Sequence, residues 1–228
     1  DILISVESSR SKTRSMLLQE SNHRIKNNLQ TITALLYMQK QSVGRGTEGV
    51  SAAEFHALMT DSISRIKRIA LIHETLTLHE EQSDSIVDIK TIIERILDFY
   101  RDLHLSVSVV ADPIAIPYDK ATLIALVINE LLNNCAKHAF PCPEAEENQV
   151  SVSCRDRRGM LEIVVRDNGR GFGQSPPAEG QGSCGMQVIR LVTTNLGGTI
   201  TYQSDHGAAA TVRIPKENLF EDTETPHM

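Results

Sequence analysis

Residues 120–140 contain three polar residues whose types and spacing could do chemistry: Glu130, Asn134 and Lys137. The apolar pattern of the same segment predicts a long amphipathic helix. Asn134 follows Glu130 by four positions and Lys137 follows Asn134 by three, so one helix face is expected to carry all three. An amide oxygen can coordinate a hard cation, an ammonium can meet phosphate charge, and a carboxylate can orient a nucleophile or a water. The set suits a magnesium-bound polyphosphate, although a solvated helix face would show the same spacing.

Two glycine-bearing loops could complete such a site. The motif "DNGRGF" (residues 167–172) follows a strand-like run, and its Asp167 can accept a hydrogen bond from an exocyclic amine. The motif "GQGSCGM" (residues 180–186) leads into a helix, and backbone amides at a helix N-terminus bind anions. Each loop alone is also compatible with an ordinary turn, so neither identifies a ligand by itself.

A single histidine, His23, stands in the polar stretch "ESNHRIKNNLQ" beside Arg24 and close to Lys26. It borders an apolar seam of helical spacing formed by Leu18, Ile25, Leu29, Ile32 and Leu36. An imidazole at the border of a helical seam is held firmly and is still reachable. A nucleophile needs such a position, although a lone surface histidine is usually inert.

The elements that would carry these residues fall into two groups. The seam around His23 predicts one helix, and an apolar stripe from about Ala52 to Leu78 predicts a second, after a glycine-containing loop. Two such helices form an antiparallel hairpin with too small a core of its own, so we expect dimerisation into a four-helix bundle. The polar segment "HEEQSDS" (residues 79–85) reads as a linker.

Beyond the linker, helical and strand-like patterns alternate. A helix around 88–103, the helix 120–140 and a helix beginning at "MQVIRL" are interspersed with strands, two of which turn at "RRG". This order predicts an α/β sandwich with one sheet and helices on one face. The chain is therefore predicted to be α+β, with a helical hairpin in residues 1–83 and the sandwich in residues 84–228.

Composition limits the function further. The 228 residues are 40% hydrophobic and 23% charged, with a formal net charge of −6. No basic surface is expected for nucleic acid, no apolar run approaches the roughly 20 residues of a membrane span, and no signal peptide is recognisable. The four cysteines lack zinc-binding spacing. We expect a cytoplasmic protein that contacts neither nucleic acid nor membrane.

The succession of the Asn-bearing helix, "DNGRGF", the glycine-rich loop and "LGG" resembles the N, G1 and G2 boxes of an ATP-binding fold. Histidine kinases, gyrase, Hsp90 and MutL share that fold, and the resemblance spans about residues 86–215. It implies that Asn134 is the Mg²⁺ ligand, that Asp167 reads adenine, and that Lys137 and His138 lie toward phosphate. It also implies that the nucleotide loops are shaped by Gly169, Gly171, Gly182 and Gly185, and that Glu130 is the catalytic carboxylate.

Upstream, "HRIKNNLQTITALL" and "RIALIHETL" resemble the phosphoacceptor hairpin of HisKA_2 histidine kinases, which are close to the HWE class. The resemblance implies that His23 attacks the γ-phosphorus of ATP and becomes a phosphoramidate. The expected protein is a homodimeric sensor histidine kinase core that uses ATP and Mg²⁺. It would pass the phosphoryl group to an aspartate in the receiver domain of a response regulator.

The sequence departs from the family pattern at three positions. Arg24 stands where the commoner HisKA kinases have an acidic residue, which leaves the general base open. Glu74 or Glu20 could orient the acceptor imidazole, although Glu74 is also compatible with a solvated surface charge. Ala208 replaces a usual threonine, so one lid or phosphate contact is expected to be missing. Cys135 replaces a usual alanine, a change expected to affect packing only.

Two other functions are compatible with parts of the sequence. A non-catalytic phosphotransfer or scaffold protein would carry a degenerate nucleotide fold, but Asn134, Asp167 and Gly169 are all present. An ATP-hydrolysing machine of the same superfamily would use Glu130 with water, and it would leave the phosphoacceptor-like hairpin unexplained.

Overall fold

The computed structural model describes four stretches from residue 86 onward and isolated positions before them. The contacts between residues divide the chain into two compact units, 1–62 and 63–228. The isolated positions from His56 to Ala70 are helical, in agreement with the second predicted helix. The hairpin, its dimerisation and its boundary at residue 83 otherwise lie outside the described residues and stay predictions. The described residues are 86–100, 105–142, 148–172 and 184–220, with Ser51, His56, Met59, Thr60, Ile63, Lys67 and Ala70.

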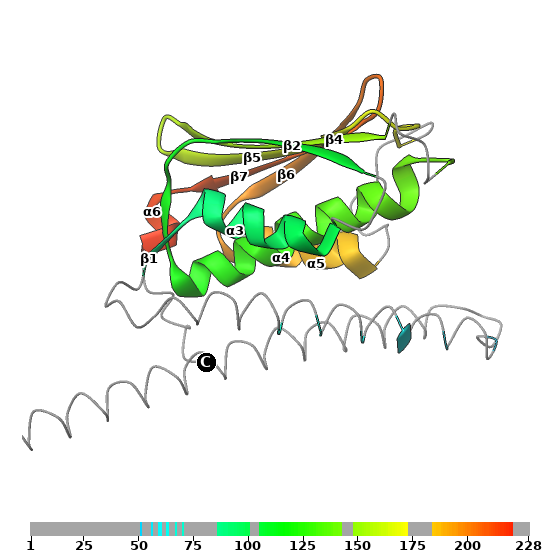
Figure 1. Cartoon of the computed structure of the whole chain (residues 1–228). Helices are drawn as coiled ribbons and strands as arrows, with labels where there is room; N and C mark the ends of the chain where they lie inside the picture. Colours follow the sequence, from blue (N-terminus) through cyan, green and yellow to red (C-terminus); the bar gives the residue numbers. More distant parts are fainter. Residues whose placement is uncertain are drawn as a thin grey trace, which may run out of the picture. The chain divides into compact units, whose positions relative to one another are not determined.

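A five-stranded mixed sheet forms one layer of the second unit (Figure 1). Its spatial order is β2-β4-β5-β7-β6, with β2 parallel to β4 and the other neighbours antiparallel. The prediction of an α+β chain with one sheet in a sandwich is confirmed. The strands are β2 (Ser106–Ala111), β4 (Gln149–Arg157), β5 (Met160–Asp167), β6 (Thr199–Ser204) and β7 (Ala208–Pro215).

Helices cover one face of this sheet, as Figure 1 shows for α3, α4 and α5. The sequence analysis did not predict a second, short sheet, in which β1 and β3 pair antiparallel. β1 leads directly into α3, and β3 leads directly into α4. None of the helices in the described ranges combines the length and apolarity needed to cross a membrane. The remaining elements are β1 (Ile86–Asp88), α3 (Ile89–Leu97), η1 (Asp98–Tyr100), β3 (Ala115–Pro117), α4 (Tyr118–Asn134), η2 (Cys135–Ala139), α5 (Cys184–Asn195) and α6 (Glu217–Phe220).

Alternation along the central strands builds the core. In β5, Leu161, Ile163 and Val165 are buried, and the residues between them are partly or fully exposed. These residues point to the helical layer because successive side chains of a strand lie on opposite faces. Helix α4 packs beneath the sheet and against both α3 and α5, and it is buried on nearly every side. A helix buried in this way is a rigid support for polar residues at its end.

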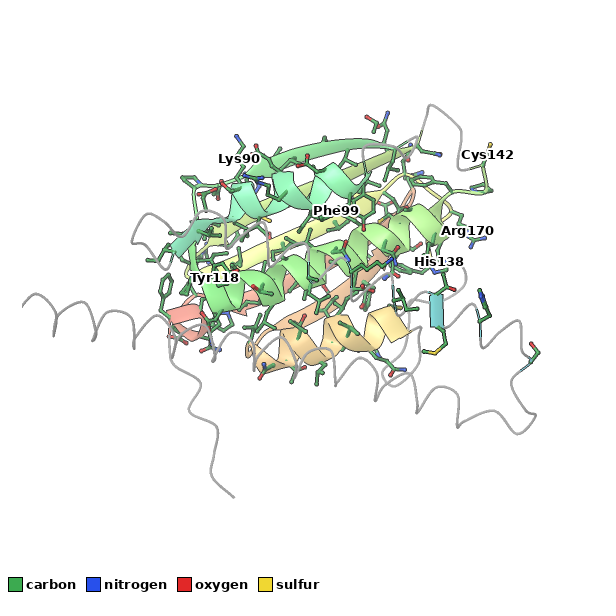
Figure 2. All side chains as sticks on the ribbon, turned by 60° about the horizontal axis from the view of Figure 1, so that its bottom comes forward. Lys90, Phe99, Tyr118, His138, Cys142 and Arg170 are labelled. Carbon is green, nitrogen blue, oxygen red and sulfur yellow. The ribbon has the colours of Figure 1, made fainter. Side chains whose placement is uncertain are left out.

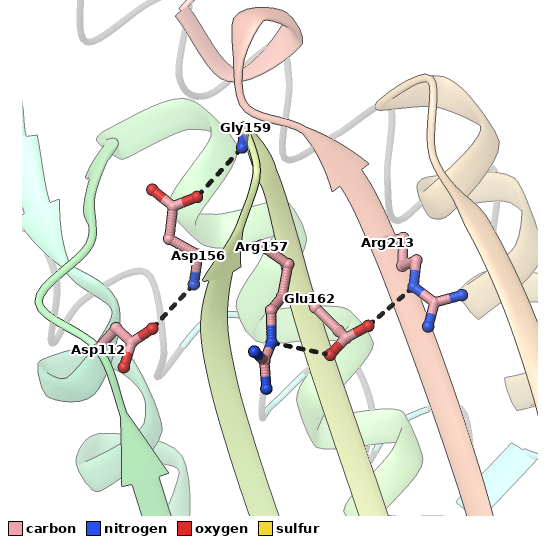
Figure 3. A network of polar contacts seen from close by, with 6 residues as sticks. All are labelled: Asp112, Asp156, Arg157, Gly159, Glu162 and Arg213. Carbon is pink, nitrogen blue, oxygen red and sulfur yellow. Dashed lines mark hydrogen bonds and ion pairs between the residues drawn. The ribbon is translucent and has the colours of Figure 1, made fainter.

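The open face of the sheet is polar and is joined by ion pairs (Figure 3). Glu162 on β5 bridges Arg157 on β4, at 3.8 Å, and Arg213 on β7, at 2.8 Å. These pairs run across neighbouring strands, where opposite charges contribute modestly to sheet stability. The face is solvated, and the packing of the sheet depends on its other side.

The β4–β5 hairpin turns at Arg158 and Gly159, whose φ angles of 55° and 81° are both left-handed. Consecutive left-handed residues are typical of a tight hairpin turn, so the predicted turn at "RRG" is confirmed. Asp156 accepts a hydrogen bond from the Gly159 amide at 3.3 Å, and its own amide donates to Asp112 (Figure 3). The hydrogen bond from Lys216 lowers the pKa of Asp156.

Replacing Ile163 with alanine tests the core. Ile163 is fully buried on the central strand β5, so Ile163→Ala should reduce the free energy of unfolding by about 2–5 kcal/mol. Urea denaturation followed by circular dichroism measures the loss. Val164→Ala, next to it on the open face, is the control and should cost much less. Equal losses would contradict the assignment of the two faces.

Candidate functional site

Helix α4 brings Glu130 and Asn134 to the site through its last turn. Glu130 is 0% exposed, and Asn134 is half-buried at the last α-helical position. The uninterrupted α-helix expected through residue 140 was wrong, because residues Cys135–Ala139 form a wider π-helical turn. Lys137 and His138 lie in this turn and are exposed. The predicted set therefore passes from a buried carboxylate, through a half-buried amide, to an exposed ammonium.

Asp167 ends β5 on the helical side of the sheet, where it is 5% exposed. Its Oδ1 atom accepts hydrogen bonds from the amides of Gly169, at 2.9 Å, and Ala208, at 3.0 Å. Two donors on one oxygen fix the orientation of the carboxylate and leave Oδ2 for other donors. This backbone contact does not depend on the side chain at position 208, and the expected loss of a lid or phosphate contact there stays a prediction.

Cys135 lies against this carboxylate and is 7% exposed. Burial, together with the charge of Asp167 and a hydrogen bond to it, raises the pKa of the Cys135 thiol well above its usual range. The thiol therefore stays protonated. The burial of Cys135 agrees with the packing role expected for it, and the nearby charge of Asp167 acts on the thiol in addition.

The "DNGRGF" loop is bound to the end of the π-helical turn. The Arg170 amide donates to the carbonyl of Ala139 at 2.9 Å, and the Arg170 Nε donates to the carbonyl of His138 at 2.8 Å. A Cβ atom on Gly169 would collide with the carbonyl of Ala139. Glycine is thus required at position 169 by the approach of the protein's own backbone. Figure 2 shows Arg170 and His138 next to each other at this end of α4.

The other end of the loop is bound to β6. The Phe172 amide donates to Ser204 Oγ at 3.2 Å, and the Phe172 ring meets Tyr202 edge to face with centroids 5.5 Å apart. Gly171 has a φ of 69° and approaches Ser204 so closely that a Cβ atom would collide with it. Ser204 and Tyr202 belong to no motif, so the sequence analysis missed them.

Tyr202 is influenced by α5 through charge. Burial raises the pKa of Tyr202, and the positive charge of Arg190 on α5 opposes the rise. Gly185 is buried in the first turn of α5, whereas Gly182 and His23 lie outside the described residues. The structure therefore brings the "DNGRGF" loop, with Asp167 and Gly169, to the end of the helix that carries Asn134, Lys137 and His138.

Comparisons with known proteins agree with this arrangement. Residues 20–104 match the HisKA_2 histidine kinase family, and residues 119–218 match the histidine kinase-, DNA gyrase B- and HSP90-like ATPase family. The chain is 32% identical over 206 residues to sensor histidine kinase PdtaS of Mycobacterium tuberculosis. The aligned region is 87% of this chain and 39% of that relative. It is 25% identical over 219 residues to blue-light-activated histidine kinase 2 of Erythrobacter litoralis, covering 91% and 60%.

A solved structure shares the fold. The histidine kinase domain of the Erythrobacter litoralis EL346 blue-light activated kinase superposes with a TM-score of 0.58 at 19% identity, over 84% of this chain and 97% of that one. The chain spans 39% and 60% of the length of the two curated relatives.

Replacing Gly169 with alanine tests the site. The new Cβ would force the loop away from Ala139, so Gly169→Ala should weaken ATP binding about tenfold or more, equivalent to about 1.4 kcal/mol. Isothermal titration calorimetry measures the affinity. The control is Gly159→Ala at the opposite end of β5, where a left-handed φ costs stability but nothing lies within 4 Å of the new atom. A loss of ATP affinity in both variants would contradict a local effect at the site.

Proposed function

The chain belongs to the HisKA_2 histidine kinases that carry a gyrase B- and HSP90-like ATPase domain, and we propose that it is the kinase core of a sensor protein. In this proposal it binds Mg-ATP in residues 84–228 and transfers the γ-phosphoryl group to His23 in residues 1–83. The single observation that carries the proposal is the buried Asp167 carboxylate, whose Oδ1 accepts from two backbone amides. The loop that follows Asp167 is hydrogen-bonded to the end of the helix that carries Asn134.

The residues around Asp167 have the chemistry that a nucleotide needs. An adenine amine can donate to the Asp167 carboxylate, whose orientation is fixed by two backbone amides. Lys137 and His138 are exposed one turn beyond Asn134 and can meet the negative charge of the phosphates. Gly182 and Gly185 flank the start of α5, whose backbone amides can hold phosphate oxygens.

Asn134 fits the role of the protein ligand for Mg²⁺. Mg²⁺ in phosphoryl-transfer sites takes one or two protein ligands and completes its shell with phosphate oxygens and waters. Asn134 offers one amide oxygen at a half-exposed position next to Lys137, which suits such a partial shell. When bound, the ion would neutralise charge on the phosphates.

Glu130 is the candidate catalytic carboxylate. It lies one helical turn before Asn134 and is shielded completely from solvent. A carboxylate without access to bulk water is suited to orienting groups at the site.

The transfer itself asks for positioning more than for covalent chemistry. A ring nitrogen of His23 forms a bond to the γ-phosphorus as the bond from that phosphorus to the bridging oxygen of ADP breaks. The imidazole proton leaves to a base, for which Glu20 and Glu74 are the candidates. The phosphoryl group then passes to an aspartate of a response regulator receiver domain, and we propose that the chain acts as a homodimer.

Labelling with radioactive ATP tests the acceptor. The wild-type chain should become a phosphoprotein whose label is stable in base and labile in acid, as a phosphoramidate is. His23→Gln removes the nucleophile and should reduce the label to background, measured by autoradiography.

The control for this experiment is His206→Gln, because His206 is a fully exposed histidine on the β6–β7 turn. It should label as the wild type does. Undiminished labelling of His23→Gln would exclude His23 as the acceptor. Steady release of inorganic phosphate that persists unchanged in His23→Gln would favour the ATP-hydrolysing alternative.

Calorimetry with Mg-ATP separates the kinase from a non-catalytic scaffold. We expect the wild type to bind Mg-ATP, and Asp167→Asn to bind about tenfold or more weakly, because a hydrogen bond to a charged group is worth about 1.5–3 kcal/mol. Asp156→Asn, at the exposed end of β4, should bind as the wild type does. A wild-type chain without affinity for ATP would favour the scaffold.

A further inference from the structure

We propose that Arg170 is a positioning residue that holds the π-helical turn of Lys137 and His138, and so sets how the triphosphate is bound. The inference rests on the proposed function, because it concerns the nucleotide of the same site. Arg170 lies between Gly169 and Gly171 in the "DNGRGF" loop, and in this proposal it acts through the turn, without contact to the substrate.

Arg170 binds two consecutive carbonyls at the end of the helix. Its amide donates to Ala139 at 2.9 Å, and its Nε donates to His138 at 2.8 Å. The last carbonyls of a helix have no partner within the helix and carry partial negative charge. A guanidinium at this place therefore satisfies an acceptor and opposes the helix dipole. The same side chain fixes the direction in which the turn ends.

The turn that it holds is an unusual one. Cys135 and Ala139 are its buried residues, and Lys137 and His138 between them are exposed. π-helical turns are rare and depend on their surroundings because their hydrogen-bond geometry is less favourable than that of an α-helix. The direction of the two exposed side chains is thus set by what holds the carbonyls of residues 138 and 139.

Arg170 also joins this turn to the residue that reads the base. Asp167 precedes Arg170 by three positions, and Gly169 between them packs against Ala139 and donates to Asp167. In this proposal one short loop contacts the base through Asp167. Through Arg170 it also positions the turn whose side chains bind the phosphates. Loss of the Arg170 side chain should leave Asp167 and its two amide donors in place.

Nucleotides with and without phosphates separate this role from a general structural one. We expect Arg170→Ala to weaken Mg-ATP binding about tenfold, as expected for the loss of one charge-assisted hydrogen bond. Adenosine affinity should change less than about twofold, because the base contact stays. The full chain is used, with calorimetry for Mg-ATP and NMR titration for adenosine. A parallel loss of both affinities would overturn the proposal.

Arg170→Lys separates geometry from charge. Lysine retains the positive charge but lacks the Nε donor of the planar guanidinium, so it should restore only part of the Mg-ATP affinity. Complete restoration would show that charge alone matters and would overturn the proposal. This variant also keeps the experiment decisive if Arg170→Ala unfolds, which circular dichroism detects. Arg166→Ala removes the same charge from the open face of β5 and should change neither affinity.

A double-mutant cycle tests whether Arg170 acts through the turn. In a Lys137→Ala background, Arg170→Ala should cost less than half of its usual effect on Mg-ATP affinity, because the residue that it positions is absent. Additive effects would overturn the proposal. Binding is measured without phosphoryl transfer, so these results remain readable even if His23 proves not to be the acceptor.

Discussion

The buried carboxylate of Asp167 is the interaction on which the site depends. Burying a carboxylate is costly unless donors compensate it, and here two backbone amides from separate segments converge on Oδ1. Gly169 follows β5 and Ala208 begins β7, so satisfying one carboxylate fixes the loop against the start of the neighbouring strand. Gly207 makes this approach possible, because a Cβ atom there would collide with the Asp167 carbonyl. The same contacts thus hold the sheet end together and orient the carboxylate that we propose as the reader of the base.

The loop after Asp167 is hydrogen-bonded to three other elements of the fold. Asn168 exchanges hydrogen bonds with Gln149 at the start of β4, Arg170 binds the end of the helical layer, and Phe172 binds β6. The glycines between them allow close approach to the protein's own atoms as much as to a nucleotide. Each residue of the loop that is not glycine therefore has an assigned neighbour, and the loop acts as a junction between sheet and helices.

The sequence predicted the parts of this arrangement that have a periodic signature. Alternation gave β5 and placed Asp167 at its end, and the helical period gave α4 with Glu130 and Asn134 near its end. The π-helical turn was missed because one widened turn does not alter the residue types. The Arg170 contact was missed because its acceptor is a backbone carbonyl, which is the same for every residue. The contact from Ala208 to Asp167 was missed for the same reason, because its donor is a backbone amide, which alanine and threonine supply equally.

The carboxylate of Asp167 has hydrogen-bonding capacity beyond its two amide donors. A carboxylate offers about four lone-pair sites, and the amides of Gly169 and Ala208 both donate to Oδ1. Oδ2 can therefore accept from a ligand without disturbing the contacts that hold the loop. In the proposed function the exocyclic amine of adenine is that donor, and a base with a carbonyl at the same position would bring an acceptor against a buried acceptor. A site built for a donor rejects such an analogue strongly, so the buried carboxylate would select the base as well as bind it.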